Sequence, residues 1–182
     1  VEAFLARRAT PLSDTFARQA VPVIARALPK VLADGTDLTA REDLSLGCFY
    51  AGLAMANANA GAIHALGYPL TGRYGIPHGL ANALVAAAVL ERVEPGRPER
   101  CLELARLMAE GGAAPGPARL ADQVRSFLTQ VGMGDRLSAW GVHEGDLPEL
   151  AEAATHFGPV LENTPVAFRQ ADLLAMYRAA WA

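Results

Sequence analysis

Apolar side chains recur every three or four residues along most of the chain, and this spacing makes one face of an α-helix continuously apolar. No segment of any length shows the strict alternation that is typical of a half-buried strand. The pattern predicts helices over residues 1–8, 11–33, 41–60, 79–92, 99–110, 118–131, 146–155 and 170–181.

Prolines and capping residues set the expected ends of the first helices. The residue before Pro11 resists helical geometry, so the first helix should stop ahead of it. Pro22 falls inside the apolar pattern of the second helix and predicts a kink or an early break. Asp34-Gly35 should end that helix. Thr39, followed three residues later by Glu42, is close to a capping box and predicts the next helix start.

The helix expected over residues 41–60 carries little side-chain bulk, because alanines and glycines make up much of it. Other helices or a ligand can therefore approach it closely, and we expect it to be the central helix of the domain. Asn57 and Asn59 are polar in this setting, and local hydrogen bonds near the helix end explain them better than a role in substrate binding. Residues 111–117 are expected to form the most flexible linker, and residues 158–165 a loop.

Composition favours one well-packed helical domain over residues 1–182. Hydrophobic residues make up 52% of the chain and charged residues 19%, which argues against disorder. The expected fold is all-α and multi-helical, with helices too short and too interrupted for a simple four-helix bundle. The net charge is −3 with acids and bases interspersed, so neither nucleic acid nor an anionic membrane is an expected partner.

Two further features bear on the cellular setting. The apolar run over residues 80–90 is well short of a membrane span. Cys48 and Cys101 lie in helix-like apolar contexts without CxxC spacing, so we expect both to be reduced, buried thiols of a cytoplasmic protein.

The segment over residues 61–81, GAIHALGYPLTGRYGIPHGLA, holds two of the four histidines, His64 and His78. On one unbroken helix, fourteen residues would separate them by roughly 21 Å, too far for two ligands of one metal ion. The prolines and glycines between them predict instead a helix that ends near Pro69, a turn-rich loop, and a new helix that begins around His78. Such a reversal can bring both imidazoles to one point, and imidazole suits Fe²⁺ and Zn²⁺.

This segment resembles the second signature of the iron-containing (group III) alcohol dehydrogenases, a glycine-spaced stretch with two metal-ligating histidines that ends in Pro-His-Gly. The matching positions are His64, Gly67, Tyr68, Leu70, Gly72, Ile76, His78 and Gly79. Further resemblance in residues 2–14, 45–60, 141–144 and 171–177 extends the similarity over most of the chain. It implies the C-terminal, dehydroquinate-synthase-like helical domain of a two-domain dehydrogenase.

The resemblance also implies a chemistry: metal-assisted hydride transfer between a small alcohol or carbonyl substrate and NAD or NADP, in a cytoplasmic homodimer. It makes His64 and His78 metal ligands for Fe²⁺ or Zn²⁺. The family often has a further histidine at the place of Tyr68. A phenol there can hydrogen-bond a substrate or pass a proton, which makes Tyr68 a candidate catalytic residue. Packing of Tyr68 against the glycines of the turn is the alternative. His143 and His156 are expected to lie near helix termini, outside the site.

Two parts of the family pattern are not found in this sequence. An Asp and a His that complete the metal site are expected just upstream of Val1, and no phosphate-cradling glycine loop occurs in the chain. We therefore expect the chain to be a fragment that, alone, is catalytically inactive and binds metal weakly if at all. A metal-independent enzyme similar to maleylacetate reductases is one alternative. A non-enzymatic helical module that docks on a partner through its Ala/Gly-rich helix is another.

Overall fold

The computed structural model describes residues 1–112 and 119–182, and those residues form helices joined by short connections, without a strand. The all-α fold predicted from the sequence is therefore confirmed. In chain order the elements are α1 (Glu2–Leu5), α2 (Pro11–Ala33), α3 (Leu38–Ala58), α4 (Ala62–Tyr74), α5 (His78–Val93), η1 (Glu94–Gly96), α6 (Pro98–Glu110), α7 (Leu120–Gln130), η2 (Leu137–Trp140), η3 (Glu144–Asp146), α8 (Leu147–Thr155), α9 (Gly158–Leu161) and α10 (Gln170–Trp181).

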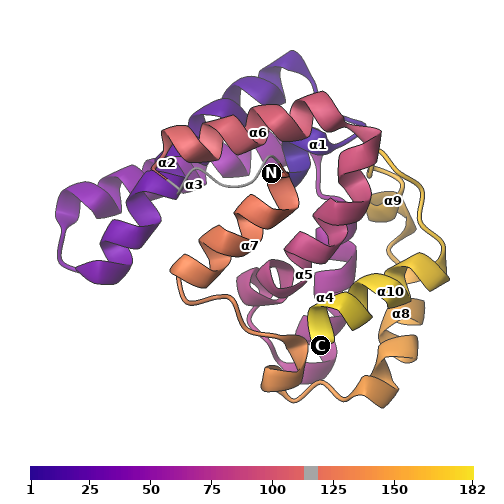
Figure 1. Ribbon diagram of the computed structural model, residues 1–182. Coiled ribbons are helices and arrows are strands. Elements are labelled where there is room, and N and C mark those ends of the chain that lie inside the picture. Colours follow the sequence, from indigo (N-terminus) through magenta and orange to yellow (C-terminus); the bar gives the residue numbers. More distant parts are fainter. Residues whose placement is uncertain (113–118) are drawn as a thin grey trace.

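The two longest helices, α2 and α3, pack along each other as a hairpin whose tip projects away from the rest of the molecule (Figure 1). The close approach depends on Gly47, because a Cβ there would lie 2.8 Å from Ile24. The small side chains of α3 thus serve packing against α2. Helix α6 also packs against α2.

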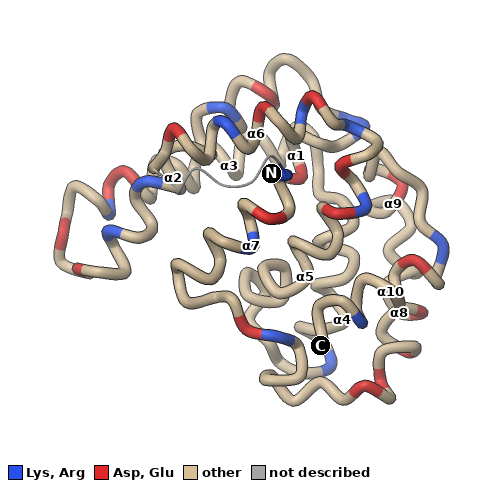
Figure 2. The backbone as a smooth tube through the Cα atoms, viewed as in Figure 1, with Lys and Arg blue, Asp and Glu red and all other residues tan. Residues whose placement is uncertain are grey.

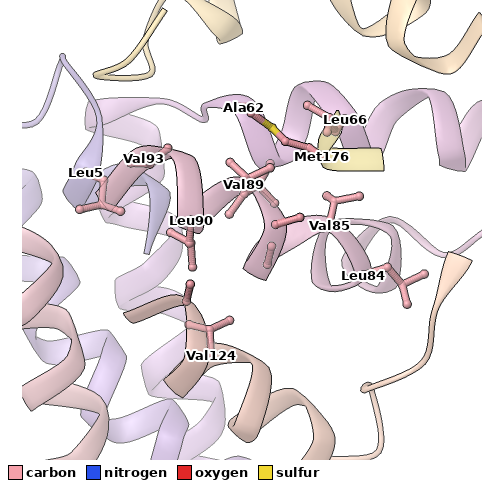
Figure 3. Close-up of a cluster of buried hydrophobic side chains, with 14 of the residues drawn as sticks. Leu5, Ala62, Leu66, Leu84, Val85, Val89, Leu90, Val93, Val124 and Met176 are labelled. Atoms are coloured by element: carbon pink, nitrogen blue, oxygen red, sulfur yellow. The ribbon is translucent and has the colours of Figure 1, made fainter. Parts of the chain in front are cut away.

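Helix α5 is the centre of the other part of the fold, with α4, α7 and α10 packed around it. The side chains that α5 contributes to the core are almost fully buried: Val85, Val89, Leu90 and Val93 are each 3% exposed or less. They meet side chains from α1, α4, α7 and α10, namely Leu5, Ala62, Leu66, Val124 and Met176 (Figure 3). The expectation that residues 41–60 form the central helix is therefore wrong, since α5 has that place.

Helix α1 is short but firmly held. Phe4 is fully buried, and the guanidinium of Arg100 on α6 lies 4.0 Å from the centre of its ring. Arg100 also donates to the carbonyl oxygen of Phe4 (2.8 Å) and to Asp14 of α2 (2.5 Å). One side chain therefore ties α1, α2 and α6 together, and this fixes the position of Glu2 at the start of α1.

Prolines interrupt the helices less than the sequence predicts. Helix α2 runs without a break through Pro22 and Pro29, and α4 continues past Pro69 to Tyr74. The expected early stop near Pro69 is wrong because tertiary packing outweighs the loss of one helix hydrogen bond. In α4, Leu66 and Leu70 are completely buried on either side of this proline.

Other boundaries shift by a few residues. Helix α3 begins at Leu38, earlier than predicted, because the carboxylate of Asp37 accepts from the backbone N–H of Ala40 (2.9 Å) and takes the capping role predicted for Thr39. Helix α1 covers only half of the expected residues 1–8, and α9 forms inside the expected loop over 158–165.

The predictions over residues 111–118 can be followed only in part. The central residues of the expected linker, 113–117, and the predicted start of the next helix at residue 118 lie outside the described residues.

Charge and hydropathy agree with the composition. Basic and acidic residues are interspersed along most of the helices, while acidic residues alone occur along η3 and α8 (Figure 2). Among the described residues, no helix combines the length and the apolar character that crossing a membrane requires.

Candidate metal and substrate site

The two histidines of the predicted site come together where α4 and α5 meet. Helix α4 ends at Tyr74 and is followed by Gly75, whose left-handed conformation (φ 65°) suits a glycine; α5 then begins with His78 as its first residue. The ring centres of His64 and His78 lie 5.3 Å apart. The predicted convergence of the two imidazoles is therefore confirmed, although the reversal occurs at Gly75 and not near Pro69.

The C-terminal end of α4 is fixed by the segment that precedes α8. Tyr74 donates a hydrogen bond from its hydroxyl to Asp146 (2.6 Å), and Arg73 donates to the other oxygen of that carboxylate (3.0 Å). Burial and the hydrogen bond to Asp146 raise the pKa of Tyr74 to about 12. The same hydrogen bond, with the charge of Arg73, lowers the pKa of the Asp146 carboxyl. This network holds the turn from which His78 emerges.

Tyr68 lies one helical turn after His64 and closes the site on one side. Its ring stacks on that of His78, with 5.7 Å between ring centres and 16° between planes. The centre of its ring also lies 4.8 Å from that of Phe157, in a tilted arrangement, and 6.1 Å from that of His64, in an edge-on arrangement. Tyr68 thus packs against three aromatic rings. Its phenol remains only partly buried.

Helices α4 and α5 touch closely beside these rings. A Cβ on Gly67 would lie 2.0 Å from the side-chain oxygen of Asn82, so a larger residue at this position would displace the Asn82 side chain. The nitrogen of the Asn82 amide lies 3.1 Å from Nε2 of His78, while its buried oxygen has no hydrogen-bond partner among the described residues. Asn82 therefore belongs to the immediate surroundings of the histidine pair.

Glu2 is the residue of this site that the sequence did not reveal. One of its oxygens lies within hydrogen-bond distance of Nδ1 of His64, and the other accepts from the backbone N–H of Ile63 (2.7 Å). Glu2 and His64 are 62 positions apart, and no local motif joins them. Only the packing of α1 against the start of α4 brings them together.

The arrangement fits two ligands of a metal ion. Nδ1 of His64 faces Glu2, so Nε2 is the nitrogen left for an ion, and the imidazole of His78 is close enough to share that ion. Within the described ranges, no cluster of three or more Cys, His, Asp or Glu side chains is placed to hold a metal. The described part of the chain therefore brings two imidazoles together without a third such side chain that completes a metal site.

An apolar cleft of about 390 Å³ opens beside His64. Its walls come mainly from α2, α3, α5 and α7, with single residues or pairs from α1, α4 and α6, and most of the lining side chains are apolar. His64 and Asn82 are among its few polar lining residues. The imidazole of His64 thus borders an apolar space.

The remaining sequence predictions have mixed outcomes. His143 precedes η3 and His156 follows α8, so both lie next to helix termini, as predicted. Asn57 donates to the carbonyl oxygen of Leu53 (2.8 Å), and Asn59 accepts from the next backbone N–H (2.7 Å), so the predicted local hydrogen bonds are confirmed.

The two cysteines differ. Cys101 is buried as expected, but Cys48 is exposed, so that half of the prediction is wrong. Its neighbour Gly47 is the residue that packs against α2, and the apolar surroundings in the sequence do not reveal which of the two positions faces outward.

Comparison with known proteins identifies the relatives of this fold. The profile of the Fe-containing alcohol dehydrogenase family, C-terminal part, matches residues 1–181. The chain belongs to this family. It is 34% identical over 185 residues to the 1,3-propanediol dehydrogenase of Klebsiella pneumoniae, an alignment that covers 100% of this chain and 48% of that protein.

Solved structures agree with this assignment to the iron-containing alcohol dehydrogenases. A crystal structure of 1,3-propanediol oxidoreductase superposes with a TM-score of 0.90 at 30% identity, covering 99% of this chain and 48% of that one. A maleylacetate reductase from Agrobacterium tumefaciens superposes with a TM-score of 0.86 at 25% identity, covering 99% and 48%. The chain spans about half the length of the relatives it matches, and the matched part is their helical domain.

Proposed function

We propose that this chain is the metal-binding helical domain of an NAD(P)-dependent alcohol dehydrogenase that interconverts an alcohol and an aldehyde or ketone. The observation that carries the proposal is the meeting of His64 and His78, with 5.3 Å between ring centres, beside an apolar cleft. Family membership gives this pair its context, and the dehydrogenases among the relatives supply the reaction class.

His64 and His78 are the proposed ligands of a divalent ion, Fe²⁺ or Zn²⁺. His64 would bind through Nε2, because its Nδ1 faces Glu2. When bound, such an ion supplies Lewis acidity, which favours loss of the alcohol proton in one direction and polarises the carbonyl in the other. The relatives contain a further half that this chain does not match. We propose that the remaining metal ligands and the binding site for NAD or NADP belong to the corresponding part of the complete protein.

The chain's own residues would place the substrate. The cleft beside His64 accepts the apolar part of an alcohol, and its volume of about 390 Å³ suits a small molecule. Tyr68, stacked on His78, is the proposed catalytic residue, since its partly exposed phenol can donate a hydrogen bond to the substrate oxygen. The Tyr68 ring lies between the stacked ring of His78 and the tilted ring of Phe157, and these two contacts restrict its orientation.

The experiment that tests this function is an activity assay of the complete gene product, purified without oxygen and supplied with Fe²⁺ or Zn²⁺. Alcohol-dependent reduction of NAD⁺ or NADP⁺ is expected. H64A and H78A should abolish it, because each removes a ligand, whereas H143A and H156A should retain it as matched controls. The 182-residue chain alone is expected to be inactive.

Two results would contradict the proposal. Turnover that persists after complete removal of metal would favour a metal-independent enzyme similar to the maleylacetate reductases. Absence of any dehydrogenase activity in a folded, metal-loaded gene product, across a panel of alcohols, would favour a non-enzymatic helical module.

A further inference from the structure

Both oxygens of Glu2 are used, and they have different partners. Oε1 accepts from the backbone N–H of Ile63, and Oε2 contacts Nδ1 of His64. The side chains are mostly buried, with 11% of Glu2 and 13% of His64 exposed. The contact is therefore largely shielded from competing water, unlike a surface ion pair.

Glu2 also caps α4, whose own N-cap residue, Gly61, has no side chain to do so. The hydroxyl of Thr164 accepts from the N–H of Ala62 (2.9 Å), and Glu2 accepts from the next N–H. A helix N-terminus carries partial positive charge, which favours a carboxylate at this place. The carboxylate is thus held by α4 itself, independently of the histidine.

The space around Gly61 fits the carboxylate closely. The backbone of Gly61 is extended (φ −137°), so any residue could adopt it. A Cβ there, however, would lie 2.9 Å from Oε1 of Glu2 and 3.1 Å from the hydroxyl of Thr164. Glycine at this position leaves the room in which Glu2 reaches both Ile63 and His64.

We propose that Glu2 is a positioning residue that keeps His64 in the tautomer with the proton on Nδ1 and the lone pair of Nε2 free to bind an ion shared with His78. A carboxylate only accepts hydrogen bonds, so the imidazole must donate from Nδ1. A carboxylate or carbonyl behind a metal-binding histidine fixes the ring and makes it a better ligand. The metal part of this inference rests on the proposed function. The tautomer part does not.

The variant E2Q gives the sharpest test, because a carboxamide has one accepting oxygen and one donating nitrogen. If that oxygen stays on the N–H of Ile63, the amide nitrogen faces His64 and favours the opposite tautomer, with the proton on Nε2. Side-chain ¹⁵N NMR of the metal-free chain at about pH 8.5, where imidazoles are neutral, distinguishes the two forms directly.

Glu94 provides a matched control. It accepts from the backbone N–H of Ala121 at the start of α7 (3.2 Å), and 12% of its side chain is exposed, but it contacts no histidine among the described residues. E94Q therefore removes an equally buried capping charge without touching the site. G61A is a second variant that keeps the charge of Glu2 and displaces its oxygen.

The parent chain and E94Q should show His64 protonated on Nδ1. E2Q should shift His64 toward protonation on Nε2, and G61A should shift it in the same direction to a smaller extent. An Nε2-protonated His64 in the parent chain, or a tautomer unchanged by E2Q in a chain that folds normally, would overturn the proposal.

The effect on metal binding is measured separately, under anaerobic conditions. The quantity compared is the Fe²⁺ concentration at which the NMR signals of His64 and His78 reach half of their full broadening. E2Q should weaken binding about 10- to 100-fold, the usual effect of losing such a contact, and E94Q should not. An affinity equal in E2Q and the parent would overturn the metal part. If Fe²⁺ binds neither histidine in the parent while E2Q still changes the tautomer, the metal part is overturned for this chain and the role of Glu2 in orienting His64 stands, while the proposed function is decided separately by the activity assay of the complete gene product.

Discussion

The contact between Gly67 and Asn82 allows a prediction with a magnitude. In G67A the new Cβ would lie 2.0 Å from the oxygen of Asn82 and 3.1 Å from its Cγ, well inside ordinary contact distance. Overpacking of this kind typically costs about 1–3 kcal/mol. Replacing glycine by alanine within a helix gains about 1 kcal/mol in propensity. The expected net change is a loss of about 0–2 kcal/mol in the free energy of unfolding.

Gly72 supplies the control, because it lies in the same helix, is exposed, and has no atom within 4 Å of the place that an alanine methyl group would take. G72A should therefore gain stability, by about 0.4–1 kcal/mol. The difference between G67A and G72A isolates the overpacking. Urea unfolding followed by circular dichroism measures both variants against the parent chain.

The double variant G67A/N82A should recover most of the loss, because alanine at position 82 removes the atoms that a Cβ at Gly67 would meet. The reasoning would be refuted if G67A were as stabilising as G72A, since Asn82 would then yield without cost. It would also be refuted if N82A failed to relieve the loss in G67A.

Two further predictions concern buried groups. Burial raises the pKa of Cys101 to about 11. At about pH 8 a thiol reagent should therefore modify the exposed Cys48 quickly and Cys101 only on unfolding. The variant C48S should show no fast phase of modification, and two rapidly modified thiols in the parent chain would contradict this prediction. Tyr177 donates to the carbonyl oxygen of Leu66 (2.7 Å), so Y177F should cost about 1–3 kcal/mol in urea unfolding, because that carbonyl stays buried without this donor. Burial also raises the pKa of Tyr177, so its contribution to stability is complete below about pH 10, the value in unfolded chains, and declines above it. Y177F should lose stability less steeply between about pH 9 and 11, roughly the range in which unfolded phenols ionise; an identical slope would contradict this.

Much of the fold could be predicted from local patterns. The apolar period places α5, α6, α8 and α10 within a residue or two, and Pro148 in the first turn of α8 marks its start. The start of α5 at His78 and the meeting of the two histidines also follow from the sequence between them. These features depend on residues that are neighbours in the chain.

What could not be predicted depends on distant residues. Pro69 is a helix breaker by local criteria, yet α4 continues through it because Leu66 and Leu70 are buried on both sides. Glu2 reaches His64 only because Arg100 anchors α1 to the rest of the fold. The position of α5 at the centre likewise follows from the packing of four helices, which no single segment encodes.

The central claim is that His64 and His78 form one metal-binding pair. The most direct test is a titration of the ¹⁵N-labelled 182-residue chain with Fe²⁺ without oxygen, in which paramagnetic broadening is followed at all four histidines. The account predicts that His64 and His78 broaden together with a single weak dissociation constant, that H64A or H78A removes the effect at the other, and that His143 and His156 stay sharp. Independent broadening of the two, or equal broadening of all four, would contradict it.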